Sequence, residues 1–512
     1  MSNDDRSKVV ILSDIHIGDN SKTCWYQKKY HEPYLFAALD YIKQNAELID
    51  EVILLGDVFD FWAYPCAAPP PSFSKIVQAN PDLLGPSGKL AEVASLLPDR
   101  IVYINGNHDQ NVRQDDIRQL GQIRYCSSPQ YVKTDHNHRI LFTHGHEYAI
   151  FNALDQDTPL APLPIGHFVT RAIAEHVNRI LPPGKTAADM KDGGTPFDYA
   201  IMLAAIIEAL KQPPFSITKV LLDYITSAAG VPKNTAVSLL DSRQATYNQA
   251  EEYYANLAAN WIARYGGGER GLIAVIKSVT ADHSGNYIAW YAQRDALQSE
   301  ISAELAILGH THRHRLGLKE AMINYINSGF MCPPIIDGQP QYPITFAEAD
   351  LRGCNISLKS VVKQSDAYQV VDISGQSPSD SVVYSPAQDY SCYVSILNNS
   401  SSTLSKTGGE TEVHGYYVVP PPQTISPGNR AQFWIHDFPG VEGAGGNVSY
   451  TDQANGKTTT FKYACPLIMN NNCGPKPFQN KSGSGDWSAD QVVGRGHPYF
   501  VNFFIKPAEE VK

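Results

Sequence analysis

The chain has 512 residues, of which 43% are hydrophobic and 18% charged, and its formal net charge is −11. This much apolar material excludes a disordered chain and is enough for about two to four domains with packed cores. The acidic balance argues against a general nucleic-acid coat and against a protein held on anionic membranes by its overall charge, although a local basic pocket stays compatible with it.

The cysteine spacing and the N-terminal residues indicate in which cellular compartment the protein is expected. Eight cysteines without any Cys-x-x-Cys spacing argue against a structural zinc ribbon, and a disulfide among Cys392, Cys465 and Cys473 stays open. The first residues lack a basic segment followed by a long apolar one. The longest apolar stretch, 199–207, is far shorter than the roughly 20 residues that span a bilayer. We therefore expect a soluble, cytoplasmic protein.

The N-terminal part of the chain alternates short apolar runs with polar loops. Runs at 9–12, 52–55, 101–104 and 140–142 are typical of buried strands, and a helix is expected over 34–49 between the first two. This alternation predicts an α/β sandwich over residues 1–150.

Residues 151–299 are predicted to be mostly helical, with helices over 199–210, 218–229 and 236–265. The first of these is apolar nearly all round, so it either faces an apolar ligand or forms the core of this region. The alternation of apolar runs with polar loops resumes at residue 305, so residues 300–362 are expected to complete the first domain. The helical block is then a cap inserted into that domain.

The C-terminal part differs in composition. Residues 363–380 are polar and are predicted to be a linker. Beyond them, glycine, proline, serine and asparagine separate short aromatic-rich runs of strand type, such as 433–435 and 499–504. This pattern predicts a separate all-β sandwich domain over residues 381–512.

Residues able to bind metal follow five of the expected strands. Because an open α/β sheet places its site at the carboxyl ends of its strands, we expect these side chains to lie close together. Carboxylate, amide and imidazole groups without a thiolate favour manganese, iron or zinc. The residues concerned are Asp14, His16, Asp57, Asp60, Asn107, His108, Asp109, His144, His310 and His312.

The order of these turns resembles that of the calcineurin-like metallophosphoesterases. That family has the motifs Asp-x-His, Gly-Asp-x-x-Asp, Gly-Asn-His-Asp or Glu, His and Gly-His-x-His, and the resemblance covers about residues 8–360. It implies a four-layer αββα sandwich with two divalent metal ions. The first ion would be bound by Asp14, His16, Asp57 and His312. The second would be bound by Asp57, Asn107, His144 and His310, so that Asp57 bridges the two.

The resemblance also implies a reaction. A hydroxide bridging the metals would attack a phosphodiester, pyrophosphate or phosphomonoester, which makes the protein a hydrolase of the phosphodiesterase or phosphatase type. His108 would protonate the leaving oxygen or stabilise phosphoryl charge, with Asp60 or Asp109 orienting its ring. The alternative for His108 is a hydrogen-bonding role only. Arg313 either contacts a substrate phosphate or lies on the surface, and His146 is expected not to be a ligand.

Within the family, residues 54–62 and 143–146 are most similar to the branch containing the UDP-2,3-diacylglucosamine hydrolases, which implies an acylated substrate under the helical cap. Two features depart from that branch: His108, where it often has arginine, and the added β domain. Another phosphate ester is therefore an equal alternative.

Residues 420–428, 433–435 and 440–446 are loosely similar to aegerolysin- or actinoporin-like modules. This resemblance implies contact with a membrane surface or a glycan. As an alternative to a phosphoesterase function, this toxin-like domain is the functional module of the protein, binding a membrane or a glycan. A domain that only packs or builds an oligomer is the third possibility.

Overall fold

The computed structural model describes residues 6–136, 138–211, 213, 216–265, 269–284, 288–330, 344–381, 389–413, 415–437 and 443–505. The predicted glycine-rich stretch 440–446 lies partly outside these ranges. The chain divides into two units. The first comprises Met1–Ile288, Ile307–Gly317 and Tyr325–Ser379, and the second comprises Ala289–Ala306, Leu318–Asn324 and Asp380–Lys512.

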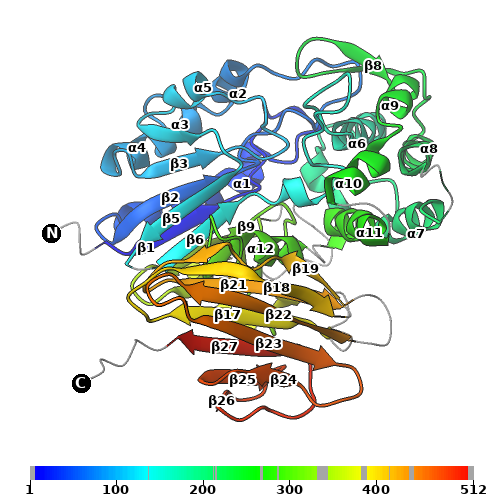
Figure 1. Cartoon of the computed structure of the whole chain (residues 1–512). Coiled ribbons are helices and arrows are strands. Elements are labelled where there is room, and N and C mark those ends of the chain that lie inside the picture. Colours follow the sequence, from blue (N-terminus) through cyan, green and yellow to red (C-terminus); the bar gives the residue numbers. More distant parts are fainter. Residues whose placement is uncertain are drawn as a thin grey trace. The chain divides into compact units, whose positions relative to one another are not determined.

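The larger sheet of the first unit has the order β15-β14-β13-β1-β2-β3-β4 (Figure 1). Strands β1 to β4 are parallel, and β13 to β15 add to the β1 edge as antiparallel neighbours. The strands are β1 (Lys8–Leu12), β2 (Ile49–Leu55), β3 (Ile101–Ile104), β4 (Ile123–Cys126), β13 (Ile344–Asp350), β14 (Asn355–Gln364) and β15 (Ala367–Asp372).

Helices that follow the strands cover this sheet. Their apolar faces join the buried side chains of β1, β2 and β3 in one core. Ser72 caps the N-terminus of α2 by accepting a hydrogen bond from the Lys75 amide. The helices are α1 (Lys28–Gln44), α2 (Phe73–Ala79), α3 (Pro81–Leu84), α4 (Lys89–Leu96) and α5 (Gln114–Arg118).

A second sheet has the order β10-β12-β9-β6-β5. Its strands are β5 (Gln130–Asp135), β6 (His138–Thr143), β9 (Leu305–Leu308), β10 (Arg315–Leu316) and β12 (Asn324–Asn327). Two sheets with flanking helices confirm the predicted mixed α/β class. All four expected N-terminal strands are present, as β1, β2, β3 and β6.

The helical region contains one departure from the sequence prediction. A single helix over 236–265 was wrong: a hairpin of β7 (Ala236–Ser238) and β8 (Gln244–Thr246) precedes α9 (Tyr247–Tyr253) and α10 (Leu257–Tyr265). Ser242 has a left-handed φ of 68° in the turn. The Thr246 hydroxyl then caps α9 by accepting from the Gln249 amide.

The remaining helices pack around an apolar core of their own. Helix α7 contributes Met202 and Ile206 to it, whereas Ile201 is 59% exposed. One side of the apolar helix predicted over 199–210 therefore packs on the core of this region, and Ile201 lies on its exposed side. These elements are α6 (Gly166–Ile180), η3 (Ala187–Asp189), η4 (Lys191–Gly194), α7 (Tyr199–Ala209), α8 (Ile217–Ala229) and α11 (Glu269–Ser284).

The predicted linker over 363–380 was wrong in its first half. Strand β15 pairs with β14 across a turn in which Ser365 has a φ of 56°. Only alternate residues of β15, Tyr368 and Val370, pack on the core, whereas Ala367 and Gln369 on its other face are exposed. An edge strand of this kind has the composition of a linker, which explains the error.

The second unit holds two β-sheets. The six-stranded sheet has the order β19-β21-β17-β27-β25-β26, and the five-stranded sheet has the order β20-β18-β22-β23-β24. Their strands are β17 (Cys392–Asn398), β18 (Leu404–Val413), β19 (Gly415–Val419), β20 (Thr424–Ile425), β21 (Arg430–Asp437), β22 (Gly443–Asp452), β23 (Thr458–Pro466), β24 (Asn472–Gly474), β25 (Phe478–Ser482), β26 (Ser488–Ala489) and β27 (Tyr499–Ile505). Side chains from both sheets form one apolar core, as in a β-sandwich.

Two segments from the middle of the chain also belong to this unit. Helix α12 (Ile288–Ala296) places Trp290 against Trp434 of β21, with ring centroids 5.1 Å apart. Strand β11 (Leu318–Lys319) pairs with β16 (Asp380–Ser381).

Cys392, Cys465 and Cys473 are free thiols, so the disulfide left open by the sequence is not formed. Each is buried, and burial raises the pKa of Cys473 to about 11. In the described part of the chain, no helix has the length and apolar character needed to cross a membrane.

Candidate metal centre

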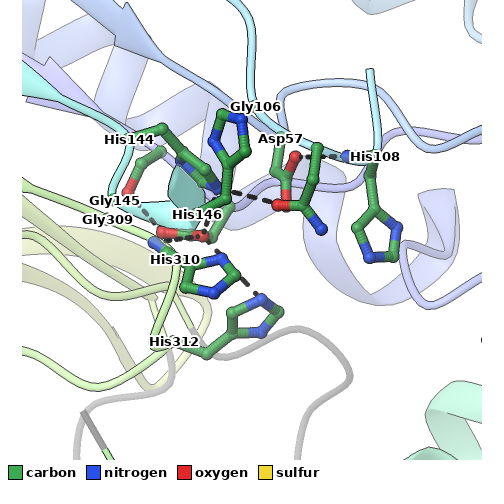
Figure 2. A network of polar contacts seen from close by, with 12 residues as sticks. Asp57, Gly106, His108, His144, Gly145, His146, Gly309, His310 and His312 are labelled. Atoms are coloured by element: carbon green, nitrogen blue, oxygen red, sulfur yellow. Dashed lines mark hydrogen bonds and ion pairs between the residues drawn. The ribbon is translucent and has the colours of Figure 1, made fainter. Parts of the chain in front are cut away.

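The predicted ligands converge at the carboxyl ends of the strands, in turns that follow β1, β2, β3, β6 and β9 (Figure 2). Asp14, His16, Asp57, Asn107 and His144 are buried. His310 and His312 are half-buried and form the more open side of the site. The structure thus brings together residues up to about 300 positions apart in sequence, as the topological rule for α/β sheets predicts.

Five of these residues have a left-handed backbone. The φ angles are 57° at Asp14, 56° at His16, 50° at Asp57, 71° at His310 and 55° at His312. Non-glycine residues seldom adopt this region, and each instance costs about 1 kcal/mol or more. The repeated conformation turns each ligand out of its strand direction toward a common point, so the strain is concentrated where ligands must converge.

The spacing of the ligand atoms suits bound cations. Asp57 Oδ2 lies 3.3 Å from His144 Nε2 and 3.8 Å from His16 Nε2, and Asp14 Oδ1 lies 3.8 Å from His312 Nε2. These separations exceed normal hydrogen bonds and approach the ~3.4 Å between ligands that each lie ~2.1 Å from one tetrahedral ion. The groups with mutually close ligand atoms are Asp14, His16 and His312; His16, Asp57 and His108; and Asp57, His144 and His310.

Neighbouring groups leave two buried ligand atoms without a partner. The Nδ1 of His144 donates to the Leu55 carbonyl (2.9 Å), which leaves its Nε2 free of hydrogen bonds. The Asn107 amide Nδ2 donates to Asn152 Oδ1 (3.2 Å), which leaves Asn107 Oδ1 without a partner. A buried imidazole nitrogen and a buried amide oxygen without partners are costly unless a metal ion binds them. The residues present therefore fit divalent metal ions.

The motifs contain glycines because the ligand side chains lie too close to these positions to leave room for a Cβ. A Cβ on Gly106 would lie 2.2 Å from Asp57 Oδ1, and one on Gly56 would lie 2.5 Å from the His144 ring. A Cβ on Gly309 would lie 2.7 Å from Asp14 Oδ2. A side chain at any of these positions would displace a ligand.

His108 stands beside the ligands with its ring held on several sides. Its Nδ1 donates to Asp60 Oδ1 (3.1 Å), and its backbone NH donates to Asp57 Oδ1 (2.8 Å), the dashed contact in Figure 2. The Trp62 ring stacks on it with centroids 4.3 Å apart. Trp25 lies 5.2 Å from His108 and 4.9 Å from His16. Neither tryptophan was predicted to be a site residue, because aromatic side chains are not among the ligand types of the motifs.

Asp60, rather than Asp109, orients His108. Asp109 accepts hydrogen bonds from the amides of Val58 (2.9 Å) and Gly106 (2.6 Å) and from the Tyr103 hydroxyl (2.6 Å). Burial, with the nearby charge of Asp57, raises the pKa of Asp109 to about 6. Asp109 thereby joins the turn after β2 to the turn after β3. Of the two aspartates that the sequence offered for orienting His108, Asp60 is the one bonded to the imidazole.

The two remaining predicted residues differ in exposure. Arg313 is exposed and its backbone NH donates to Thr311 Oγ1 (3.3 Å). His146 is buried next to His144, with ring centroids 5.5 Å apart, and burial lowers its pKa.

In the metal-free protein the pKa values of the site histidines shift in opposite directions. Burial lowers the pKa of His144, but the adjacent Asp57 carboxylate outweighs it and raises that pKa to about 10. The pKa of His16 is also raised, against burial, by Asp60, Asp57 and Asp14. At His312, burial dominates and lowers the pKa to about 4. Near neutral pH, the His144 imidazole therefore carries a proton that a metal ion would have to displace.

Comparison with known proteins agrees with the site. Residues 7–177, about a third of the chain, match the family model described as calcineurin-like phosphoesterase. No curated protein is similar enough in sequence to count as a relative.

Three solved structures show weak likeness. A dimetal phosphatase from Danio rerio is 12% identical, with 72% of this chain and 98% of that chain covered and a TM-score of 0.29. Vacuolar protein sorting 29 from Cryptosporidium parvum is 12% identical, with 72% and 96% covered and a TM-score of 0.25. The lipid binding protein Nakanori is 11% identical, with 22% and 69% covered and a TM-score of 0.18. These TM-scores are too low to establish a shared fold.

The fold and the site define a metal-dependent phosphoesterase. The family match covers the region from β1 into α6, and the same region, with the turn after β9, holds the candidate ligands for divalent metal ions.

Metal binding should release protons. Because His144 is protonated in the metal-free protein and binds metal only as a neutral imidazole, about one proton should leave per protein near neutral pH. The apparent metal affinity should then fall as the pH is lowered, by about tenfold per unit for each proton. Titration calorimetry with Mn²⁺ in two buffers of different ionisation enthalpy measures the number released. The His144→Gln variant should release fewer protons, and a release of none by the natural protein would contradict the assignment.

Proposed function

We propose that the chain hydrolyses a phosphodiester, pyrophosphate or phosphomonoester bond with two divalent metal ions held side by side. The observation that carries this proposal is the position of Asp57 Oδ2, which lies 3.3 Å from His144 Nε2 and 3.8 Å from His16 Nε2. These two histidines belong to different groups of candidate ligands. One carboxylate is therefore within reach of both groups, as a ligand shared by two ions must be.

The remaining chemistry follows from the donor set and from His108. Imidazole, carboxylate and amide ligands favour manganese, iron or zinc, and such ions, when bound, lower the pKa of coordinated water and polarise phosphoryl oxygens. We assign His108 to protonating the leaving oxygen, because its ring centroid lies 4.6 Å from that of His16 and Asp60 holds its Nδ1. Trp25 contacts both rings and borders the same space.

Replacement of the shared carboxylate tests the proposal. Asp57→Asn should lower the turnover of bis-p-nitrophenyl phosphate by the Mn²⁺-loaded protein by roughly 10²–10³-fold or more, because the neutral amide binds cations weakly. Metal content by mass spectrometry should fall in parallel, with the circular dichroism spectrum retained.

The matched control is Asp99→Asn. Asp99 is an exposed aspartate of the same unit and also has a left-handed φ, 58°, so its substitution changes the charge equally but should leave turnover unchanged. Full activity in Asp57→Asn would refute the proposed site.

The role of His108 can be separated from general damage by the leaving group. His108→Ala should slow hydrolysis of an alkyl phosphate by about 10²–10⁴-fold, because an alkoxide needs a proton as it leaves. The loss on a p-nitrophenyl ester should be much smaller, since p-nitrophenolate leaves unprotonated. Equal losses on both esters would exclude the acid role. His136→Ala, which removes an exposed histidine in the β5–β6 turn, controls for loss of an imidazole.

For the substrate we propose a phosphate ester with an apolar, acyl-type part. A cavity of about 580 Å³ lies at the end of α6, lined by Ile180, Pro182, Met190 and Pro196 together with Lys185 and Lys191. Met190 and Trp25 both pack against one buried apolar cluster, formed by Ile173, Val177 and Ala187. Since Trp25 also contacts His16 and His108, the cavity and the metal centre border the same cluster. Lysines at the cavity suit an anionic head group.

A polar change in the cavity should separate long from short substrates. Met190→Gln should raise the KM for a long-chain acyl phosphodiester about tenfold, since a polar amide in the cavity wall is a poorer contact for an apolar chain. The KM and kcat for bis-p-nitrophenyl phosphate should stay unchanged. An equal KM for the acyl substrate in both proteins would exclude this cavity as the acyl site while leaving the phosphoesterase proposal intact.

A further inference from the structure

Exposed apolar side chains gather in one part of the second unit. Of the eight large apolar residues that stand out as exposed in the described chain, four lie within positions 468–492. They are Ile468 (68% exposed), Met469 (69%), Trp487 (46%) and Val492 (40%). Single exposed apolar residues are ordinary, but a group of this kind marks an interaction surface.

The four residues lie on loops that hydrogen bonds join. Asn471, next to the first pair, donates to Ser482 Oγ (2.7 Å) and to the Gly496 carbonyl (2.8 Å). Asn480 donates to the carbonyls of Ser488 (3.2 Å) and Gln491 (2.8 Å), which flank the other two. We call Ile468, Met469, Trp487 and Val492 the loop patch.

The loop patch lies where both sheets of the unit end. Ile468 and Met469 precede β24, the last strand of the five-stranded sheet, and Trp487 directly precedes β26, the last strand of the six-stranded sheet. Strand β25 pairs with β26, and the bond from Asn471, next to β24, reaches Ser482 at the end of β25; the three strands are labelled in Figure 1. These edge strands have three and two residues, too short to recruit another strand from a second copy of the chain.

The segment that carries the loop patch is slightly basic. Residues 466–498 hold three lysines and arginines against two aspartates, a balance of 3 − 2 = +1. Lys476 and Arg495 are exposed, and Lys481 Nζ lies over the Trp487 ring, 5.4 Å from its centroid. The lysine occupies one face of that ring, which disfavours the stacking of a sugar there.

We propose that the loop patch docks this protein on a lipid membrane surface that contains anionic phospholipids. Aliphatic side chains on short loops can enter the acyl boundary without exposing strand edges, and tryptophan is the residue that favours the interface. The adjacent basic side chains face the phosphate head groups. This function is independent of the phosphoesterase site, which lies in the other unit.

The test is co-sedimentation of the full-length protein with vesicles of phosphatidylcholine, with and without phosphatidylserine. The protein should bind the anionic vesicles, and added salt should weaken the binding because it screens the lysines. The Ile468→Ser/Met469→Ser double variant and Trp487→Ser should each bind at least about tenfold more weakly. The intrinsic tryptophan fluorescence change on binding should be smaller in Trp487→Phe.

Ile201→Ser is the matched control, since Ile201 is 59% exposed but lies on α7 of the first unit. It should bind vesicles as the natural protein does. Thermal unfolding and bis-p-nitrophenyl phosphate turnover verify that each variant is folded, so that loss of binding with retained turnover concerns the loop patch alone. No binding to either vesicle, binding that the loop-patch variants do not change, or binding only to a glycan array would overturn the proposal.

Discussion

The organisation of the first unit depends on one constraint: several anionic and imidazole groups must lie within about 4 Å of each other in a nearly dry site. Asp57 is the most constrained of them, because it is buried and yet its pKa is held well below the usual range by His144, His108 and His16 despite the cost of desolvation. Removing any of these neighbours would leave a buried charge partly unpaired. Cations bound at the same place would serve the same purpose more strongly.

The backbone around the site meets this constraint at a cost in strain. Five left-handed ligand residues together cost about 5 kcal/mol or more, which only a well-packed surrounding structure can offset. The strands that precede them supply that packing, since Val10, Ile53, Ile104 and Leu308 are fully buried. Rigid strand ends followed by strained turns explain why the ligands can hold their positions before any metal binds.

The sequence predicted the site residues that belong to short motifs directly after a strand. Each ligand turn directly follows an apolar run, so order and position sufficed to nominate Asp14 and His310 alike. Asn152, which orients the Asn107 amide from 45 positions away, has no such local signal. Trp25 was missed for the same reason. The β7–β8 hairpin and the edge strand β15 were missed because turn residues and half-polar strands look like ordinary helix surface or linker in composition.

The second unit is tied to the metal centre through the chain itself. Residues 307–317, which carry His310 and His312, belong to the first unit, whereas the segments on both sides of them belong to the second. Those segments are bonded to each other, by Met322 NH to Gln293 Oε1 (2.8 Å) and by Asn324 NH to the Glu304 carbonyl (2.8 Å). The turn with two ligands is therefore bordered along the chain by segments of the second unit, while β9 before it and β10 after it belong to a sheet that also contains β6 of the first unit. Its position thus depends on pairing within that sheet, between strands far apart in sequence.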